Sequence, residues 1–325
     1  MSVKSLKKFA VGAVAGGTAF AGLSYIVFDS VMNRDGQVFR KAADMITEMQ
    51  NKKHGKAAPV EEVANPRIEW FNKQRYDVFE IESVRGYKLK GYFYEADEKS
   101  NAYLFMSHGY RSSGLGEFNR MAKFYHELGF NLLIVDHQAH GDSEGKYIGF
   151  GYYEYQDGLR WLDFLNEKFG NDIQIALTGV SMGSATVMMM TGSPCLPDNV
   201  KFTVADCGYT TAYEEFVHDL GMAKIPPRPL LDGADFFNKL VGGYHFKDAD
   251  ALSAVKRAKI PMLFIHGSAD WFVPTSMGKE LFLASSAPDK ELVIIEGAEH
   301  AESYDVDPET YEAAVKRFTD KYIVK

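Results

Sequence analysis

Cysteine is scarce in this sequence, with only Cys195 and Cys207 among 325 residues. Two cysteines form at most one disulfide, so a small fold held together by a disulfide framework is excluded. Their spacing also matches no metal-ligand motif. We expect each thiol to pack as a small apolar group, and a single bond between the two stays open as an alternative for an exported domain.

An excess of positive charge is missing as well. Lysine and arginine total 36 against 44 aspartates and glutamates, which gives a formal net charge of −8. No basic stripe runs along the chain, so the electrostatic signature of a nucleic-acid-binding protein is absent. The hydrophobic content of 46% over 325 residues is enough for a large core, and a single α/β domain can reach this length.

Charge is absent from Phe9 to Phe28, a run of twenty residues that follows lysines at positions 4, 7 and 8. Twenty residues at helical rise span about 30 Å, the thickness of one hydrocarbon core. Lysines before such a run favour a cytoplasmic N-terminus, so the pattern predicts a membrane anchor within residues 1–30. Two alternatives stay open: a signal peptide cleaved after Ala19-Phe20-Ala21, and a buried helix of a soluble protein.

The rest of the chain divides into a spacer and one large domain. Residues 31–75 are polar and only partly helical in pattern, which is typical of a spacer. From 76 to 325, strand-like and helix-like segments follow one another. The anchor and the signal peptide would both place this domain outside the cytoplasm, either held at the membrane or secreted.

Hydrophobic periodicity indicates the elements of the large domain. Alternating residues predict an antiparallel pair of strands at 76–81 and 87–94. Strands and helices then alternate, which indicates a parallel sheet with crossover helices. The further expected strands are 103–107, 131–136, 173–178, 202–205, 260–265 and 291–295, and the expected helices are 117–128, 153–169, 182–191, 276–285 and 308–322. The alternation stops at about 210–252, which predicts a helical insertion between the sixth and seventh strands.

A G-x-S-x-G motif, Gly179-Val180-Ser181-Met182-Gly183, lies between an expected strand and an expected helix. The five letters alone are only a hypothesis, but strand, sharp turn and helix in this order define a nucleophile elbow. Such a turn lifts the serine hydroxyl above the sheet, and glycines without a Cβ let strand and helix approach closely. The motif therefore predicts Ser181 as a nucleophile.

A serine nucleophile needs a general base and an acid that orients the base. His300 follows the last expected strand, at the edge where such sheets place their sites, and is the expected base. Asp270 follows the strand before it and is the favoured acid. Asp206, after the sixth strand, stays open as the alternative acid, and otherwise as a structural carboxylate near the site.

Two backbone N–H groups are expected to form an oxyanion hole. One belongs to Met182, at the positive end of the helix after the nucleophile. The other belongs to Tyr110, in the loop after the third strand. His108 lies in the same loop but precedes the serine in the chain, so we expect it to hold the loop in shape.

Together these motifs resemble those of serine hydrolases of the α/β-hydrolase superfamily. Its landmarks occur here in order as His108-Gly-Tyr110, Asp136-x-x-x-His-Gly-Asp-Ser143, the Ser181 elbow, His266-Gly-Ser-Ala-Asp270 and His300. More narrowly, the chain is similar to small bacterial membrane-anchored esterase-like hydrolases. The resemblance implies an α/β-hydrolase fold, with a mostly parallel eight-stranded sheet, helices on both faces and a helical lid in the insertion.

The resemblance also implies cleavage of small-molecule carboxylic esters through an acyl-enzyme, without a cofactor. Trp271 and Phe272, directly after the acid, are candidates for walls of the acyl pocket. A peptidase or amidase and an acyltransferase use the same triad and stay open as alternatives. A non-catalytic binding protein on this scaffold would commonly lack a member of the triad, whereas all three are present here.

The loop Asp136-His-Gln-Ala-His-Gly-Asp-Ser143 departs from the pattern of the family, because Gln138 and Ala139 stand where arginine and glycine are frequent. Its histidines and carboxylates are residue types that bind zinc. The loop nevertheless has a structural place in the hydrolase pattern, and we expect no metal.

Overall fold

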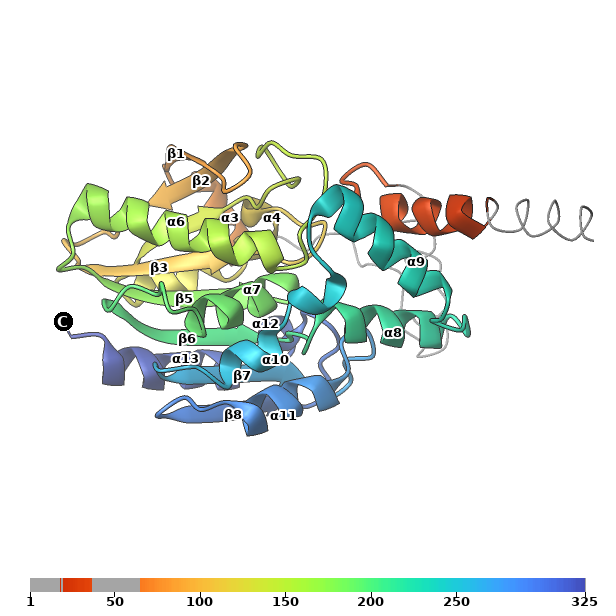
Figure 1. Cartoon of the computed structure of the whole chain (residues 1–325). Helices are drawn as coiled ribbons and strands as arrows, with labels where there is room; N and C mark the ends of the chain where they lie inside the picture. Colours follow the sequence, from red (N-terminus) through yellow and green to blue (C-terminus); the bar gives the residue numbers. More distant parts are fainter. Residues whose placement is uncertain (1–17, 19, 37–64, 325) are drawn as a thin grey trace, which may run out of the picture. The chain divides into compact units, whose positions relative to one another are not determined.

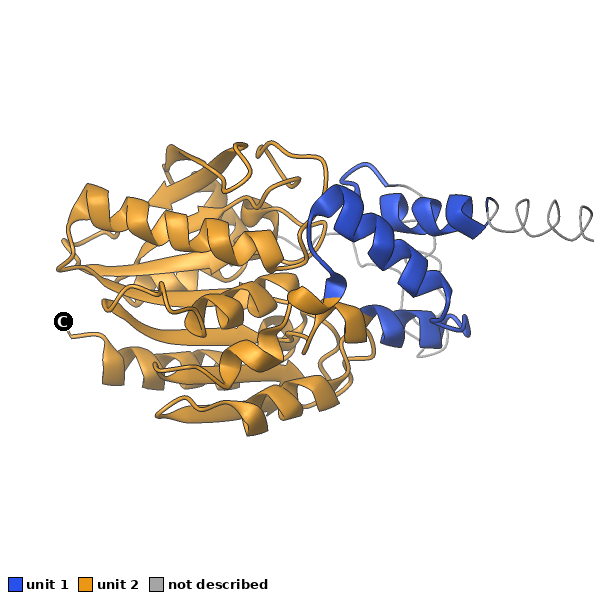
Figure 2. Cartoon of the chain, in the orientation of Figure 1, with its two compact units in different colours: residues 1–58, 216–246 blue, residues 59–215, 247–325 orange. Residues whose placement is uncertain are grey.

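The computed structural model describes residues 18, 20–36 and 65–324 (Figure 1). The chain divides into two compact units, one of residues 1–58 and 216–246 and one of residues 59–215 and 247–325 (Figure 2). The larger unit holds an eight-stranded sheet with the strand order β1-β2-β4-β3-β5-β6-β7-β8.

All eight expected strands are present, each within two residues of its expected ends. They are β1 (Asp77–Glu82), β2 (Lys88–Tyr94), β3 (Ala102–Ser107), β4 (Asn131–Val135), β5 (Gln174–Val180), β6 (Val200–Asp206), β7 (Met262–Gly267) and β8 (Lys290–Ile295). β2 pairs antiparallel with β1 and β4, and all other neighbours pair in parallel. The sheet is therefore mostly parallel, as expected.

The central strands of the sheet are buried on both sides because helices cover both of its faces. On β3, Leu104 and Met106 belong to one hydrophobic core, together with residues of α5 (Ala122–Glu127) and α13 (Pro308–Tyr322). Tyr103 and Phe105 point the other way, as alternate strand residues must. They belong to a second core with residues of α6 (Tyr152–Phe169) and α7 (Met182–Thr191).

The single helix expected at 117–128 is wrong. The structure has two short helices there, α4 (Gly114–Phe118) and α5. α4 begins early because Ser113 caps it and because Gly114 donates its N–H to Asp136 Oδ1 over 2.7 Å. A Cβ on Gly114 would lie 2.7 Å from the carbonyl oxygen of Val135, so only glycine fits against the sheet. The start of α4 is thus fixed by tertiary contacts, which periodicity does not report.

The expected insertion between the sixth and seventh strands is confirmed. It holds α8 (Ala212–Met222), α9 (Leu230–Phe237), a π-helical turn η1 (Asn238–Gly242), a 3-10 turn η2 (Phe246–Asp248) and α10 (Ala251–Val255). Its residues 216–246 belong to the smaller unit, together with a helix at residues 20–32. The remaining helices are α11 (Thr275–Ala284) and α12 (Ser303–Val306), in the larger unit.

The N-terminal part of the chain is described only in pieces. α3 (Pro66–Lys73) falls in the segment assigned to the spacer, yet it belongs to the larger unit, where the buried Phe71 stacks on Tyr94 at 5.3 Å. Residues 37–64 of the spacer and residues 1–17 and 19 of the expected anchor lie outside the described residues. Among the helices that are described, none is both long and apolar enough to cross a membrane.

Candidate active site

Ser181 lies in the sharp turn between β5 and α7. Its backbone has φ 56° and ψ −118°, a conformation that non-glycine residues rarely adopt. A Cβ on Gly183 would lie 1.9 Å from the carbonyl oxygen of Ser107, and a Cβ on Gly179 would lie 2.2 Å from that of Gly183. Both glycines are therefore needed for the close approach of strand and helix, which is the geometry of a nucleophile elbow.

The structure brings the expected nucleophile, base and acid together, although they are far apart in sequence. His300 Nε2 lies 2.8 Å from Ser181 Oγ, and His300 Nδ1 lies 2.9 Å from Asp270 Oδ2. A carboxylate only accepts hydrogen bonds, so Nδ1 carries the hydrogen of the neutral ring and Nε2 can accept the serine proton. The side chain of His300 is 19% exposed, and that of Asp270 is fully buried.

Asp270 is held by hydrogen bonds to both carboxylate oxygens. Oδ1 accepts the backbone N–H groups of Phe272 at 3.1 Å and Val273 at 2.9 Å. Oδ2 faces His300 and also lies 3.2 Å from His266 Nε2. Burial acts to raise the pKa of Asp270, but the bonds to the two histidines outweigh it and lower the pKa below its usual value. The carboxylate is therefore ionised and fixed in direction.

His266 is a further member of this group, which the sequence motifs did not indicate as a partner of Asp270. The ring is buried, and its Nε2–H is shared between the carbonyl oxygen of Val273, at 2.9 Å, and Asp270. Burial acts to lower the pKa of His266, but the bond to Asp270 outweighs it and raises the pKa. A Cβ on Gly278 of α11 would lie 2.4 Å from Nδ1, so this glycine makes room for the ring.

Asp206, the alternative acid, contacts Ser303 rather than the base: the Ser303 hydroxyl donates to its Oδ1 over 3.2 Å. It is buried beside the group, and burial raises its pKa to about 7. The geometry therefore favours Asp270 as the partner of His300.

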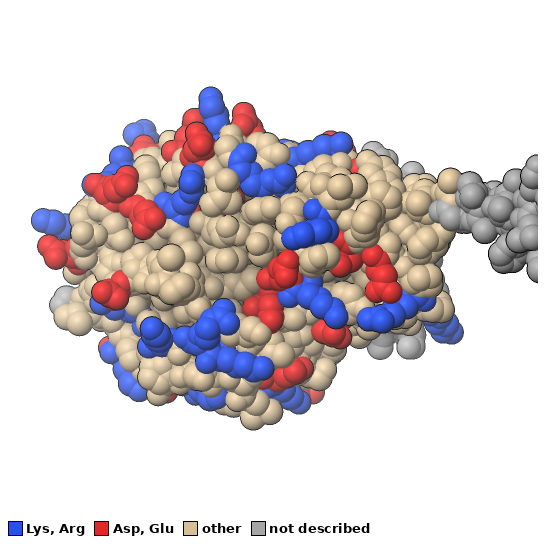
Figure 3. All heavy atoms as spheres, viewed as in Figure 1, with Lys and Arg blue, Asp and Glu red and all other residues tan. Residues whose placement is uncertain are grey.

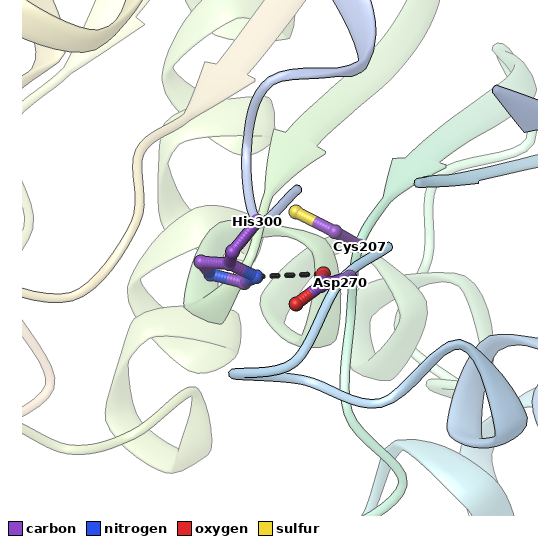
Figure 4. Close-up of side chains that lie close together, drawn as sticks. All are labelled: Cys207, Asp270 and His300. Atoms are coloured by element: carbon purple, nitrogen blue, oxygen red, sulfur yellow. Dashed lines mark hydrogen bonds and ion pairs between the residues drawn. The ribbon is translucent and has the colours of Figure 1, made fainter. Parts of the chain in front are cut away.

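Cys207 lies next to the Asp270–His300 pair (Figure 4). One ligand atom from each of these three residues lies within 4.8 Å of the others, and all three are residue types that bind zinc. However, Asp270 and His300 are already bonded to each other, and burial raises the pKa of the thiol, which keeps it protonated. Both cysteines are free, so the alternative of a disulfide is wrong, and Cys195 is exposed rather than packed.

The loop expected to supply an oxyanion donor lies beside the nucleophile. A Cβ on Gly109 would lie 3.4 Å from the Cβ of Ser181. Tyr110 follows directly, and its ring packs on that of Phe150 at 4.8 Å. Met182 is the first residue of α7, where backbone N–H groups have no partner within the helix. Both expected donors thus flank Ser181 in the chain or in space.

The aromatic residues after Asp270 also lie at the site. The ring of Phe272 is 5.0 Å from that of His300, and Trp271 packs edge-on against Phe272 at 5.9 Å. Both side chains are half-buried. Their role as walls of an acyl pocket stays a prediction.

The loop 136–143 uses its polar groups for structure. Oδ2 of Asp136 accepts the hydroxyl of Tyr92 at 2.8 Å and the N–H of Asp142 at 2.9 Å. His137 Nε2 lies 2.7 Å from Ser107 Oγ, and His140 Nε2 accepts the N–H of Arg111 at 3.0 Å. These contacts tie the loop to β2, to the end of β3 and to the loop that holds Tyr110 and Arg111.

Comparison with known proteins agrees with this fold. Residues 229–307 match the family model described as serine aminopeptidase, S33. The uncharacterized protein YqkD of Bacillus subtilis (strain 168) is 34% identical over 254 residues, which cover 78% of this chain and 82% of YqkD. The chain therefore belongs to the family of YqkD, and it is a hydrolase of the α/β-hydrolase superfamily.

Solved structures show the same fold at lower identity. The esterase Pf2001 of Pyrococcus furiosus has a TM-score of 0.65 at 24% identity, covering 82% of this chain and 98% of that one. The acylaminoacyl peptidase of Pyrococcus horikoshii has a TM-score of 0.57 at 16% identity, covering 76% of this chain and 41% of that one. The fold thus occurs both in an esterase and in a peptidase, so the bond that is cleaved depends on the site.

Proposed function

We propose that this chain is a serine hydrolase that cleaves carboxylic esters of small molecules through an acyl-enzyme. The observation that carries the proposal is the continuous hydrogen-bonded path from Ser181 Oγ through His300 to Asp270, with contacts of 2.8 and 2.9 Å. A nucleophile on an elbow, a base in reach and an orienting acid are what nucleophilic acyl transfer requires.

In the first half-reaction Ser181 Oγ attacks the ester carbonyl carbon while His300 Nε2 takes its proton. Asp270 keeps the ring in the correct tautomer and stabilises the imidazolium. The N–H groups of Tyr110 and Met182 donate to the oxyanion of the tetrahedral intermediate. The intermediate then collapses, the C–O bond to the alcohol breaks, and the alcohol leaves with the proton from His300.

In the second half-reaction water replaces the alcohol. His300 Nε2 takes a proton from the water, whose oxygen attacks the acyl carbon, and the acid product leaves as Ser181 recovers its proton. The ring of Phe272 beside His300 and the neighbouring Trp271 offer an apolar surface for the acyl group. None of these steps requires a cofactor.

A peptidase is the second candidate, because residues 229–307 match the serine aminopeptidase family model. The test is a comparison of ester and amide substrates that carry the same acyl group, with Ser181→Ala as the control. We expect the ester to react far faster, and no turnover in the variant. Faster amide cleavage would replace the esterase with a peptidase, and acyl transfer to an added alcohol in preference to water would make it an acyltransferase.

We also propose that the N-terminal run anchors the enzyme in the cell membrane, with the hydrolase outside the cytoplasm. The support is the uncharged run from Phe9 to Phe28 and the lysines before it. Full-length enzyme should sediment with membranes, resist salt and dissolve in detergent, and protease added to wall-stripped cells should digest the hydrolase. Recovery in the cytosolic fraction would contradict the anchor, and a mature N-terminus at Gly22 in the medium would favour a secreted enzyme.

A further inference from the structure

The helix at residues 20–32 exposes large apolar side chains along one face. Phe20, Leu23 and Ile26 follow one another at intervals of three residues, which places them on the same side of a helix. They are 38%, 51% and 52% exposed. On the face shown in Figure 3, uncharged side chains gather over this helix.

The insertion exposes apolar side chains in the same compact unit. Phe236 at the end of α9 and Leu240 in η1 are four residues apart in a continuous helical stretch, and they are 62% and 69% exposed. Ile225, in the turn between α8 and α9, is 42% exposed. Single exposed apolar residues are ordinary, but a set of this size within one small unit indicates a contact surface.

The two helices pack directly on each other. A Cβ on Gly233 of α9 would lie 2.2 Å from Ser24 Oγ, so the glycine allows the two backbones to approach closely. One residue further along, the ring of Tyr25 meets that of Phe237 edge-on at 5.3 Å. The contact therefore joins α9 to the last part of the uncharged run, just before Asp29, the first charged residue after it.

We infer that Phe236 and Leu240, with Phe20, Leu23 and Ile26, form a lipid-docking surface that lies on the outer face of the bilayer. The inference rests on the proposed anchor. If the run enters the bilayer and Asp29 marks its water side, a helix packed on Ser24 and Tyr25 lies at the boundary between acyl chains and headgroups. Its exposed apolar side chains then face lipid.

Charge near the surface fits the same occupant. Lys224 precedes Ile225 and Lys239 precedes Leu240, and both lysines are exposed. Lysines beside apolar side chains that insert into lipid extend toward the membrane–water interface, where anionic headgroups attract them. The exposed carboxylate of Asp232 lies 3.7 Å from the Arg228 guanidinium, which offsets its charge.

The test places a fluorescent label on the surface in full-length enzyme. Cys195→Ser removes the exposed thiol and leaves only the buried Cys207. Phe236→Cys and Leu240→Cys are then labelled singly with a polarity-sensitive dye and mixed with vesicles of phosphatidylcholine and phosphatidylglycerol. Leu283→Cys is the matched control, since Leu283 is also apolar and 76% exposed but lies on α11 of the larger unit.

At 236 and 240 we expect blue-shifted emission, several-fold weaker quenching by aqueous iodide and strong quenching by nitroxide lipids, with little change at 283. Labels at 236 and 240 that stay solvent-like while the enzyme floats with the vesicles would overturn the surface. Protection from iodide without quenching by nitroxide lipids would indicate a protein partner, and an equal shift at 283 would indicate unspecific adsorption; both overturn it. Enzyme that stays in the aqueous phase overturns anchor and surface together.

The outcome is separable from that of the proposed function. Phe236→Ser with Leu240→Ser should leave the hydrolysis of a water-soluble ester unchanged and slow the hydrolysis of an ester embedded in the vesicles several-fold. If the variant hydrolyses both the soluble and the embedded ester at the rates of the parent, the lipid-docking surface is contradicted. Absence of any ester hydrolysis in the parent enzyme would refute the esterase, while the labels would still report on the lipid contact.

Discussion

The Nδ1–H of His108 donates a hydrogen bond to the carbonyl oxygen of Gly109 over 2.7 Å. That carbonyl shares a rigid peptide plane with the N–H of Tyr110, the expected oxyanion donor. Nε2 of the same ring accepts the N–H of His137 at 3.1 Å, so both ring nitrogens are used. Burial lowers the pKa of His108, which keeps the ring neutral and able to make both bonds. His108 thus fixes the direction of the N–H of Tyr110, the expected donor.

His108→Leu should therefore lower kcat with little change in KM, because the donor acts mainly in the transition state. We expect a loss of about 10- to 100-fold, somewhat less than that for removal of an oxyanion donor. His126→Leu is the control: this buried histidine of α5 also contacts a backbone carbonyl, that of Glu95, at 2.9 Å. Steady-state kinetics with equal losses in the two variants would show that His108 is only structural.

Asp270→Asn should lower kcat by about 10,000-fold, because an amide at this position favours the wrong histidine tautomer. Asp206→Asn should do far less, since Asp206 contacts Ser303 instead of the base. Circular dichroism checks that both variants are folded. A larger loss of kcat in Asp206→Asn would reverse the assignment of the acid.

His266 should tune the base through Asp270. Loss of its N–H donor leaves more negative charge on the carboxylate, which stabilises a positive charge on the neighbouring ring of the base. In His266→Leu the acid limb of kcat/KM should move to higher pH, by on the order of one pH unit. In His266→Gln, whose amide can still donate, it should move less. An unchanged pH profile in both variants would mean that His266 only packs.

Asp157 on α6 offers a test of stability against pH. Burial raises its pKa to about 7, although its Oδ1 accepts the N–H of Val84 at 2.7 Å. In the unfolded chain the pKa is about 3.9. Between these values the folded state holds a proton that the unfolded state releases, so stability falls as the pH rises toward 7 and stays lower above it.

In the variant Asp157→Asn the side chain cannot ionise, and its amide oxygen can still accept the hydrogen bond from the N–H of Val84. The free energy of unfolding of the variant should exceed that of the parent at pH 8, by on the order of 2 kcal/mol, and should match it at pH 4. Urea denaturation at the two pH values measures the difference. Asp163→Asn, at an exposed site on the same helix, should show no such dependence. A parent–variant difference that is equal at both pH values would contradict the account.

The strands and the grouping of Ser181, His300 and Asp270 could be predicted because their signals are local or follow chain order. The Ser181 elbow is encoded in five adjacent residues. Asp270 follows β7 and His300 follows β8, and these two strands are neighbours both in the chain and in the sheet. The role of His266 depends on residues that are not its neighbours in sequence. Gly278 of a later helix leaves room for its ring, and Asp270, which it contacts, already has His300 as a partner. The pair His266-Gly267 before an aspartate is the only signal that could have indicated it.

Two other features also depend on contacts between distant residues: the break between α4 and α5, and the packing of the N-terminal helix. The residues from 117 to 128 have a helical pattern, but the close approach of Gly114 to Val135 sets where α4 begins. The composition of the uncharged run alone predicts a membrane anchor. Its packing on α9 depends on Ser24 meeting Gly233, a match between segments about 200 residues apart in the chain.

The central claim is that Ser181 is the nucleophile. It is tested most directly by mass spectrometry of full-length enzyme treated with a fluorophosphonate, which forms a stable covalent bond to an activated serine. We expect one adduct, on the peptide that contains Ser181, with parallel loss of ester hydrolysis, and neither adduct nor hydrolysis in Ser181→Ala. An adduct on another serine, or full hydrolysis in Ser181→Ala, would contradict the account.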